Sequence, residues 1–475
     1  MHQRRVDFDV REVRDRVARK AWSLDRLPML VGSMFMGLSG CKPTHAPSDG
    51  CGKDVDCKGD RICIDGACVA PPSAEEVKPD LAASPEPRPT AGQGERWFRG
   101  GPGHAGATSA VGPKDEPTPL WTLELGAVVF ATPTLAEGPK GLTAYVGTHA
   151  GRFVGVVLDG EQGGAIDLDV DLGGRIWATA AASEAESPDD LRLYVGNDDD
   201  TLFALSPAAA AEAGDPIAWR QRLGNCEDTR SPGPEGARCD VDGGPTLMPG
   251  GDLLVGADGV YRLTPEGETR WRWPAPEDVE RPKHVFSTPV LSGERVFFGG
   301  QDGFVTALKA ANGEQLWQHA VRADVDGSGV VGPDGELFIG ADDGRLYALR
   351  SDGSLRWSFV AQRDIRSSIG IAADGTLYAT SFDRNLYSIA ASGEVNWVLP
   401  TGAPIHSSPV VDGDGTVFFG SQDDHLYAVS AKGEVLWALD VGADIDSSVA
   451  ISTNGALVIG CDDGTLRAFG PPAGR

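Results

Sequence analysis

The stretch that decides the fold is Pro404–Gly442, PIHSSPVVDGDGTVFFGSQDDHLYAVSAKGEVLWALDVG. It contains four short runs in which apolar residues alternate with other residues, and each run has the length of a β-strand. The turns between the runs, DGDG, QDD and AKG, supply the positive φ angles that tight antiparallel connections need. The stretch therefore predicts a four-stranded antiparallel meander.

Imperfect copies of this meander fill most of the chain. Trp317, Trp357, Trp397 and Trp437 follow one another at steps of 40 residues, and a four-strand repeat of about 40–45 residues is typical of a propeller blade. The third-strand motif occurs eight times, at 151–158, 201–206, 259–264, 304–309, 345–350, 385–390, 425–430 and 465–470. Eight first-strand pairs agree with this number: Ala131-Thr132, Ala178-Thr179, Gly243-Gly244, Ser287-Thr288, Gly327-Ser328, Ser367-Ser368, Ser407-Ser408 and Ser447-Ser448. We therefore expect an all-β, eight-bladed propeller.

The last copy lacks a fourth strand, because the sequence ends at Arg475 soon after TLRAFG. The segment WTLELG, which begins at Trp121 before the first complete copy, has the sequence of that missing strand. We expect it to pair with the last blade and close the ring, since a closed ring leaves no open sheet edge at the seam.

The repeats resemble PQQ-like, or quinoprotein-like, β-propeller repeats. The segment Ala307–Trp317, ALKAANGEQLW, is close to the family's docking motif, and Trp97–Pro113 is similar to the segment that opens many such propellers. The resemblance implies that the recurring Trp of each blade docks onto the next blade. Seven of the eight places carry it: Trp121, Trp219, Trp271, Trp317, Trp357, Trp397 and Trp437. The eighth place, in AIDLDVDLGG, has none, so we expect a weaker seam between the first two blades.

Composition and charge divide the chain into four parts. Lys and Arg number 42 against 69 Asp and Glu, a net charge of −27, which argues against nucleic acid and anionic membrane as partners of the propeller. We expect a leader and lipoprotein-type signal peptide at 1–40, a lipidated, Cys-rich knot at 41–69, a Pro/Glu-rich flexible linker at 70–95 and the propeller at 96–475.

The segment before Cys41 is a short apolar run that follows Arg19, Lys20 and Arg26. Leu38–Cys41 resembles the bacterial lipobox, which implies diacylation of Cys41 and export to the cell envelope; the alternative is an ordinary apolar leader with a chance Cys. Lys42 favours the outer membrane over the inner one, so the protein would face the periplasm or the cell surface. Membrane contact would be through the lipid only.

The other cysteines predict disulfides behind an export signal. Cys51, Cys57, Cys63 and Cys68 allow three pairings, and a zinc site is the alternative, although the C-x2-C spacing typical of zinc is missing. Cys226 and Cys239 are expected to pair and to staple the loop that they bracket. Cys461 is expected to be an inert, buried thiol rather than a reactive one.

Catalytic signals are weak throughout the sequence. In the PQQ dehydrogenases that the resemblance includes, adjacent cysteines form a vicinal disulfide against the quinone, and this chain has no adjacent Cys pair. Asp324–Gly329, DVDGSG, begins like a Ca²⁺ loop, but Gly335 stands where a bidentate Glu is needed. We therefore expect no catalytic residue, no metal and no cofactor, neither PQQ nor Ca²⁺.

These observations favour a non-catalytic, monomeric scaffold that binds a protein partner in the cell envelope. In architecture the chain is similar to the lipoprotein subunit of the β-barrel assembly machinery, but it adds the Cys-rich knot and the long linker. A PQQ- or metal-dependent oxidoreductase and a small-molecule or ion sensor are the alternatives, because a propeller fold alone does not determine function.

One rim of the ring is the expected binding site. The connections from fourth to first strand and from second to third strand emerge on the same face, and nineteen Asp residues lie in them: 198, 199, 200, 240, 242, 258, 302, 324, 326, 342, 343, 364, 383, 423, 424, 444, 446, 462 and 463. The residues just before the first-strand pairs are Phe130, Trp177, Asp242, Phe286, Asp326, Arg366, His406 and Asp446. Such a rim suits a basic partner segment with an aromatic or apolar anchor. The alternative is that Asp recurs because turns favour it and the face is merely solvated.

Lipidation of Cys41 is directly testable. We expect cells fed an alkyne fatty acid to label the wild-type protein and to leave the Cys41→Ala variant unlabelled, because only the Cys41 thiol accepts the diacylglyceryl group. The measurement is in-gel fluorescence after click coupling of the purified protein. Equal labelling of both proteins would contradict the lipobox interpretation.

Overall fold

The computed structural model describes residues 106–158, 160–212, 214–224, 240–275 and 284–471, together with the backbone of 62–64 and 67–69. Two compact units divide the chain at Pro71. In the first unit, β1 (Ile62–Ile64) pairs with β2 (Ala67–Val69) in an antiparallel hairpin that sets Cys63 opposite Cys68. No helix in the described part of the chain is both long and apolar enough to span a membrane.

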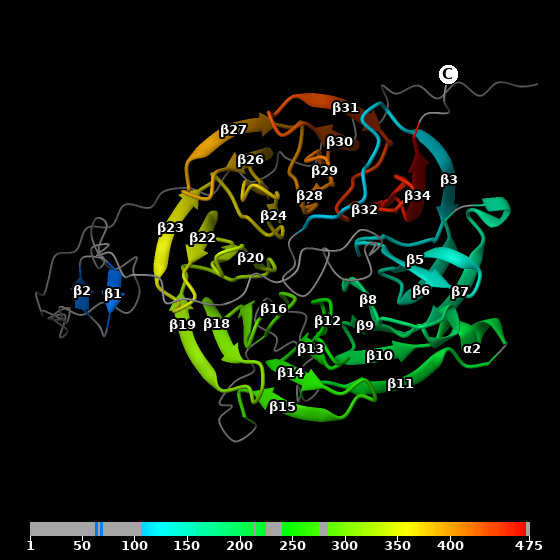
Figure 1. Ribbon diagram of the computed structural model, residues 1–475, viewed down its shortest axis with the longest axis horizontal. Coiled ribbons are helices and arrows are strands. Elements are labelled where there is room, and N and C mark those ends of the chain that lie inside the picture. Colours follow the sequence, from blue (N-terminus) through cyan, green and yellow to red (C-terminus); the bar gives the residue numbers. More distant parts are fainter. Residues whose placement is uncertain are drawn as a thin grey trace, which may run out of the picture. The chain divides into compact units, whose positions relative to one another are not determined.

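The second unit consists of eight four-stranded antiparallel sheets that follow one another around a ring (Figure 1). The prediction of an eight-bladed β-propeller is confirmed. Blades 1 to 4 are β4–β7 (Thr134–Gly138, Gly141–Gly147, Arg152–Val157, Ile166–Asp171), β8–β11 (Ala181–Ala182, Leu193–Asn197, Thr201–Leu205, Ile217–Arg222), β12–β15 (Thr246–Leu247, Leu253–Gly256, Val260–Leu263, Thr269–Trp273) and β16–β19 (Val290–Ser292, Arg295–Gly299, Phe304–Lys309, Gln315–Ala320).

Blades 5 to 7 are β20–β23 (Val330–Val331, Leu337–Gly340, Arg345–Leu349, Leu355–Val360), β24–β27 (Gly370–Ile371, Leu377–Ser381, Asn385–Ile389, Val395–Pro400) and β28–β31 (Val410–Val411, Val417–Gly420, His425–Val429, Val435–Asp440). Blade 8 combines β32–β34 (Ala450–Ile451, Leu457–Gly460, Thr465–Gly470) with β3 (Thr118–Glu124), the strand that precedes blade 1 in the chain. In β3, Trp121 lies opposite Ala468, just as Trp437 lies opposite Ala428 in blade 7. The predicted closure of the ring by this segment is therefore confirmed.

An outer ring of hydrogen bonds joins each blade to the next. The indole Nε1 of Trp317 donates to Ser351 O at 3.0 Å, in the turn between the third and fourth strands of the following blade. The same bond, at 2.8–3.0 Å, links the other docking residues to their acceptors: Trp121 to Leu158, Trp219 to Pro265, Trp271 to Ala310, Trp357 to Ala391, Trp397 to Ala431 and Trp437 to Pro113. Seven seams thus share one polar contact.

The first-strand pairs form an inner ring of bonds around the channel. The first Ser of a pair binds its own blade: Ser447 Oγ donates to Gly460 O and accepts from Gly460 N–H, both at 2.9 Å. The second residue binds the preceding blade, so that Ser408 N–H donates to Ser448 Oγ at 3.2 Å and Ser368 N–H to Ser408 Oγ at 3.0 Å. A small hydroxyl side chain therefore satisfies backbone N–H groups that would otherwise be buried without a partner.

Two seams are irregular, and other residues join the blades there. Leu168 of β7 occupies the place that lacks a Trp, and it is buried against Ala210 of helix α2 (Pro207–Ala211), which lies between β10 and β11. At the seam between blades 7 and 8, the fourth strand of blade 8 is β3, so no turn runs directly from its third strand to its fourth strand to provide the acceptor for Trp437. The segment that precedes β3 supplies Pro113 O instead, and Thr108 N–H anchors that segment to Val411 O at 2.9 Å.

Glycines in the turns under the indoles test the outer ring. Gly353 has φ +85°, and an added Cβ would lie 2.6 Å from Cδ2 of Trp317, whereas Gly335 of the same blade has φ +81° and open space around it. We expect Gly335→Ala to lower the free energy of unfolding by about 1 kcal/mol through backbone strain. Gly353→Ala should lower it by about 1–3 kcal/mol more, because it also displaces Trp317. Urea denaturation measures both, and equal losses would contradict the docking interpretation.

Candidate interaction surface

The first strands of all blades start from one face of the ring, which we call the upper face. The antiparallel order of the strands returns the second strand of each blade to that face. Consequently the residues before the first strands and the turns between second and third strands meet around the upper mouth of the channel, as the sequence analysis assumed.

At the mouth, the turn of one blade contacts the residue before the first strand of the next blade. His149 of blade 1 lies against Trp177 of blade 2, with ring centroids 3.9 Å apart. Phe382 of blade 6 lies against His406 of blade 7 at 5.4 Å. Polar pairs occupy the same place in other seams, since Gln301 Nε2 donates to Asp326 at 3.2 Å, Arg366 binds Asp342 and Gln422 binds Asp446.

Five rings form an aromatic cluster, which we define as Phe130, His149, Trp177, Phe382 and His406. Phe130 packs edge-on against Trp177 at 4.9 Å and against His406 at 4.6 Å. Blades 1 and 7 are separated by blade 8, so the contact between Phe130 and His406 reaches past a blade. Each of the five residues keeps part of its surface exposed. Burial, and secondarily the charge of Arg366, lowers the pKa of His406 to about 4, so this ring is neutral at pH 7.

Beside the cluster, charged side chains of blades 5 and 6 form an arc, which we define as Asp326, Asp342 and Arg366, whereas Asp446 of blade 8 stands between His406 and Phe130. Arg366 is the only cation among the described residues just before the first strands. The guanidinium of Arg366 binds the Asp342 carboxylate through two bonds of 3.0 and 2.5 Å and lies over the ring of Phe382. Burial raises the pKa values of Asp326 and Asp342. Burial, followed by the charge of Asp462, raises the pKa of Asp446 to about 7.

Some Asp residues of the upper face accept hydrogen bonds within turns, and others are buried or paired with Arg. Those at the second position of a turn stabilise the turn itself: Asp423, for example, accepts hydrogen bonds from Tyr427 Oη at 2.8 Å and from Gly402 N–H at 2.7 Å. Tyr387 and Tyr347 bind Asp383 and Asp343 in the same way. Asp200, Asp240 and Asp258 are buried, and Arg222 and Arg272 pair with Asp200 and Asp258. The face is therefore less uniformly negative than a count of carboxylates suggests.

The remaining predicted site residues lie outside the aromatic cluster, and several of them lie outside the described residues. Phe286 lies 6.5 Å from the His284 ring, apart from the aromatic cluster, and Asp242 is partly buried. Cys461 is buried, and burial raises the pKa of its thiol to about 11. Cys41, Cys51, Cys57, Cys226 and Cys239 lie outside the described residues, and of Cys63 and Cys68 only the backbone is described.

Two members of the aromatic cluster, His149 and Phe382, were not among the predicted rim residues. Both occupy the first position of the turn after a second strand, where Gln301, Asp342, Gln422 and Asp462 stand in other blades. A spacing of 40 residues links this position from blade 5 to blade 8, at 342, 382, 422 and 462, so the sequence contained a signal for Phe382.

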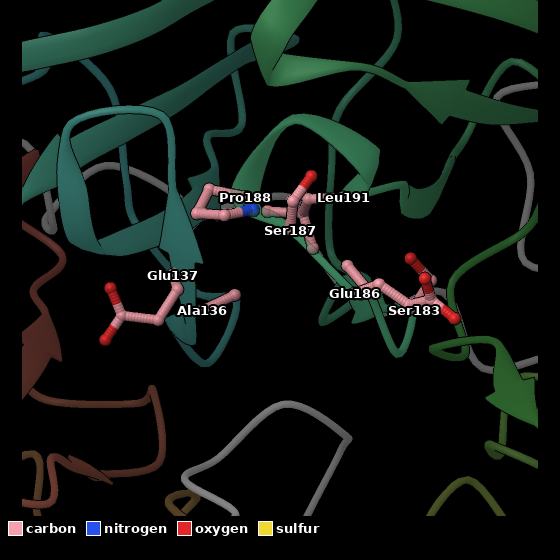
Figure 2. A pocket seen from close by; sticks show the side chains of 8 residues that line it. Ala136, Glu137, Ser183, Glu186, Ser187, Pro188 and Leu191 are labelled. Carbon is pink, nitrogen blue, oxygen red and sulfur yellow. The ribbon is translucent and has the colours of Figure 1, made fainter.

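A pocket of about 230 Å³ lies on the lower face, where β4 meets the insert between β8 and β9. Figure 2 shows Glu137 on one side of it and Ser183 and Glu186 on the other. Its lining contains two carboxylates, Glu137 and Glu186, and no Lys, Arg or His. In the described part of the chain, no three His, Cys, Asp or Glu side chains lie close enough together to hold a metal ion.

Comparisons with known proteins agree with the fold. The model of the family "Outer membrane protein assembly factor BamB" matches residues 208–368 and 342–475, which together span more than half of the chain. No curated protein matches the sequence significantly.

Among solved structures, BamB from Moraxella catarrhalis is similar with a TM-score of 0.56 and 17% identity over 75% of this chain and 100% of its own. The computationally designed Ika8 protein has a TM-score of 0.57 and 14% identity, over 74% and 99%. A europium-containing methanol dehydrogenase has a TM-score of 0.61 and 12% identity, over 79% and 98%. At these identities the similarity establishes the propeller fold.

The raised pKa of Asp446 predicts a pH effect on stability. In the unfolded chain an Asp titrates near pH 4, so between about pH 4 and pH 7 the folded protein holds a proton that the unfolded chain has lost. The free energy of unfolding therefore falls as the pH rises through this range. We expect Asp446→Asn, which removes this titration, to gain at least about 1 kcal/mol relative to wild type between pH 5 and pH 8. Urea denaturation at both pH values measures it, and an unchanged difference would contradict the assignment.

Proposed function

Because the chain belongs to the family of the outer membrane protein assembly factor BamB, we propose that it is a lipid-anchored, non-catalytic scaffold that binds a protein partner in the cell envelope. The lipid at Cys41 would hold the propeller at the outer membrane, and residues 70–95 would let it reach its partner. The partner would dock on the upper face, at the mouth of the channel.

The aromatic cluster beside the charged arc is the observation that carries this proposal. Partly exposed aromatic side chains that are held rigidly by their neighbours are the residues that most often dominate binding at protein interfaces. Trp177 is held by His149 and Phe130, so little conformational entropy would be lost when a partner covers it.

The charges define the chemistry of the partner. The net charge of −27 and the carboxylates of the upper face attract a basic segment and accelerate its association. An apolar or aromatic side chain of that segment would pack on the exposed part of the cluster. Burial of carboxylates such as Asp326 by the partner would favour cationic side chains over neutral ones.

The residues of this chain do not fit the cofactor chemistry of a quinoprotein. The sequence contains no adjacent Cys pair, and Gly335 replaces the bidentate Glu that the Asp324 loop would need to bind Ca²⁺. The similarity to a methanol dehydrogenase is one of fold, so we derive no reaction from it. An ion sensor would need a set of ligands, and no three His, Cys, Asp or Glu side chains among the described residues lie close enough together to hold a metal ion.

The test begins with the partner recovered by cross-linking of the cell envelope. Its association rate should fall as ionic strength rises, because salt screens the attraction between charges. Asp199→Asn combined with Asp302→Asn should also slow association, whereas Glu184→Gln with Glu186→Gln on the lower face should not. Trp177→Ala should raise the dissociation rate about tenfold, as expected for an interface anchor. Biolayer interferometry measures both rates, and binding that ignores both salt and Trp177 would place the site elsewhere.

A further inference from the structure

The outer strands at the perimeter of the ring differ in how many charged residues they contain. The fourth strand of each blade is an edge strand, and natural proteins usually place charges on such edges to prevent pairing with other chains. Six of the eight outer strands contain charged residues, such as Asp169 and Asp171 in β7 and Arg220 and Arg222 in β11. Only β19 and β27 contain no Asp, Glu, Lys or Arg.

Of these two, β27 is the apolar one. Its sequence is VNWVLP, and Val395 and Val398 are exposed by 43% and 46%. The equivalent strand of blade 4 is QLWQHA, in which a glutamine, Gln318, stands at the place of Val398. Exposed apolar side chains continue on the neighbouring outer strands, with Val360 at 56% in β23 and Val435 at 45% in β31. Figure 1 shows β27 on the perimeter between these two strands.

The hydrogen-bond register determines which backbone groups of β27 face outward. Thr401 N–H donates to Arg384 O at 2.8 Å, so the pair 401 and 384 is a hydrogen-bonded pair of the ladder between β26 and β27. Val398 lies opposite Tyr387, three steps further along the ladder. Because hydrogen-bonded and non-hydrogen-bonded pairs alternate in an antiparallel ladder, the N–H and C=O of Val398 point away from β26 and toward the perimeter.

We propose that β27 is a docking edge to which a partner protein adds an extended, uncharged or basic β-strand of about six residues. The outward N–H and C=O groups can be satisfied only by another strand or by water, and the exposed valines match the alternate side chains of an apolar strand. This surface lies at the perimeter and is separate from the channel mouth, so the inference goes beyond the proposed function.

The net charge of the chain argues against a second copy of this protein as the source of the strand that binds β27. Each copy carries a net charge of −27, and two such molecules would repel each other at close approach. A six-residue strand pair also buries less surface than stable dimers require. A neutral or cationic strand of a different protein experiences no such repulsion, and a cationic strand is in addition attracted by the field of the acidic propeller.

The test removes one outward N–H without touching the ladder. Val398→Pro deletes the N–H that the added strand would use, and proline is tolerated where an edge-strand N–H faces solvent. Ala438→Pro is the matched control in β31: Val441 N–H donates to Asp424 O at 2.8 Å, so Ala438 also faces outward. The probe is a fluorescein-labelled peptide of nine residues that alternates valine with threonine and lysine, and its binding is followed by fluorescence anisotropy.

We expect saturable binding to the wild-type full-length protein and to the Ala438→Pro variant. Val398→Pro should weaken it about fivefold, which is the effect of one net backbone hydrogen bond. If Val398→Pro fails to fold by circular dichroism, Val398→Lys with Ala438→Lys as control replaces it, since an edge lysine blocks strand addition. Absence of binding to wild type, or equal losses in the two variants of a pair, would overturn the proposal. A dimer in sedimentation velocity that Val398→Pro abolishes would overturn it in favour of self-pairing.

Discussion

Seven seams between blades share an indole N–H bond at the perimeter, several seams also share a backbone N–H bond to a hydroxyl at the channel, and the rest of the propeller depends on these two contacts. The perimeter bond runs from a Trp to a carbonyl of the next blade, and the channel bond runs from a strand N–H to a Ser or Thr hydroxyl of the next blade. A buried polar group without a partner costs about 1–3 kcal/mol. The penalty applies to buried N–H groups at the channel, such as those of Ser368 and Ser408, so these bonds restrict the angle between blades in addition to apolar packing.

The same requirement explains why function is concentrated at the positions that do not repeat. Replacement of Ser408 by a residue without a hydroxyl would leave the buried N–H of Ser368 unpaired, and replacement of Trp357 would remove its bond to Ala391 O at the perimeter. The position before each first-strand pair has no role in either ring, and its residues range from Phe130 to Arg366 and Asp446. The fold therefore places eight positions around the channel mouth whose residues are not constrained by the two hydrogen-bonding rings. In this protein the two kinds of side chain are interleaved: Asp446 of blade 8 stands between His406 and Phe130, and Phe286 stands between Asp242 and Asp326.

Much of the fold could be predicted from the sequence, because the period of 40 residues, the turn glycines and the recurring Trp all derive from local chemistry. Blade number and the closure by Trp121 followed from that period. Three features did not. Leu168 with helix α2 replaces a Trp, Pro113 replaces a missing acceptor, and Phe130 contacts His406 past an intervening blade. Each depends on how far a side chain or segment reaches in space, which sequence spacing does not encode.

The environments of the individual Asp residues could not be predicted from the sequence either. Spacing placed nineteen of them on one face, but it could not separate Asp423, which accepts bonds from Tyr427 and from a neighbouring loop, from Asp446, which lies beside Asp462 in a largely desolvated position. The first carboxylate is satisfied by hydrogen-bond donors within the protein. The second accepts hydrogen bonds from Gln422, but the nearby Asp462 carboxylate repels its negative charge and burial raises its pKa. A cationic partner side chain would relieve this repulsion, so on the proposed binding surface the rings would receive an apolar side chain and the acids would select a basic one.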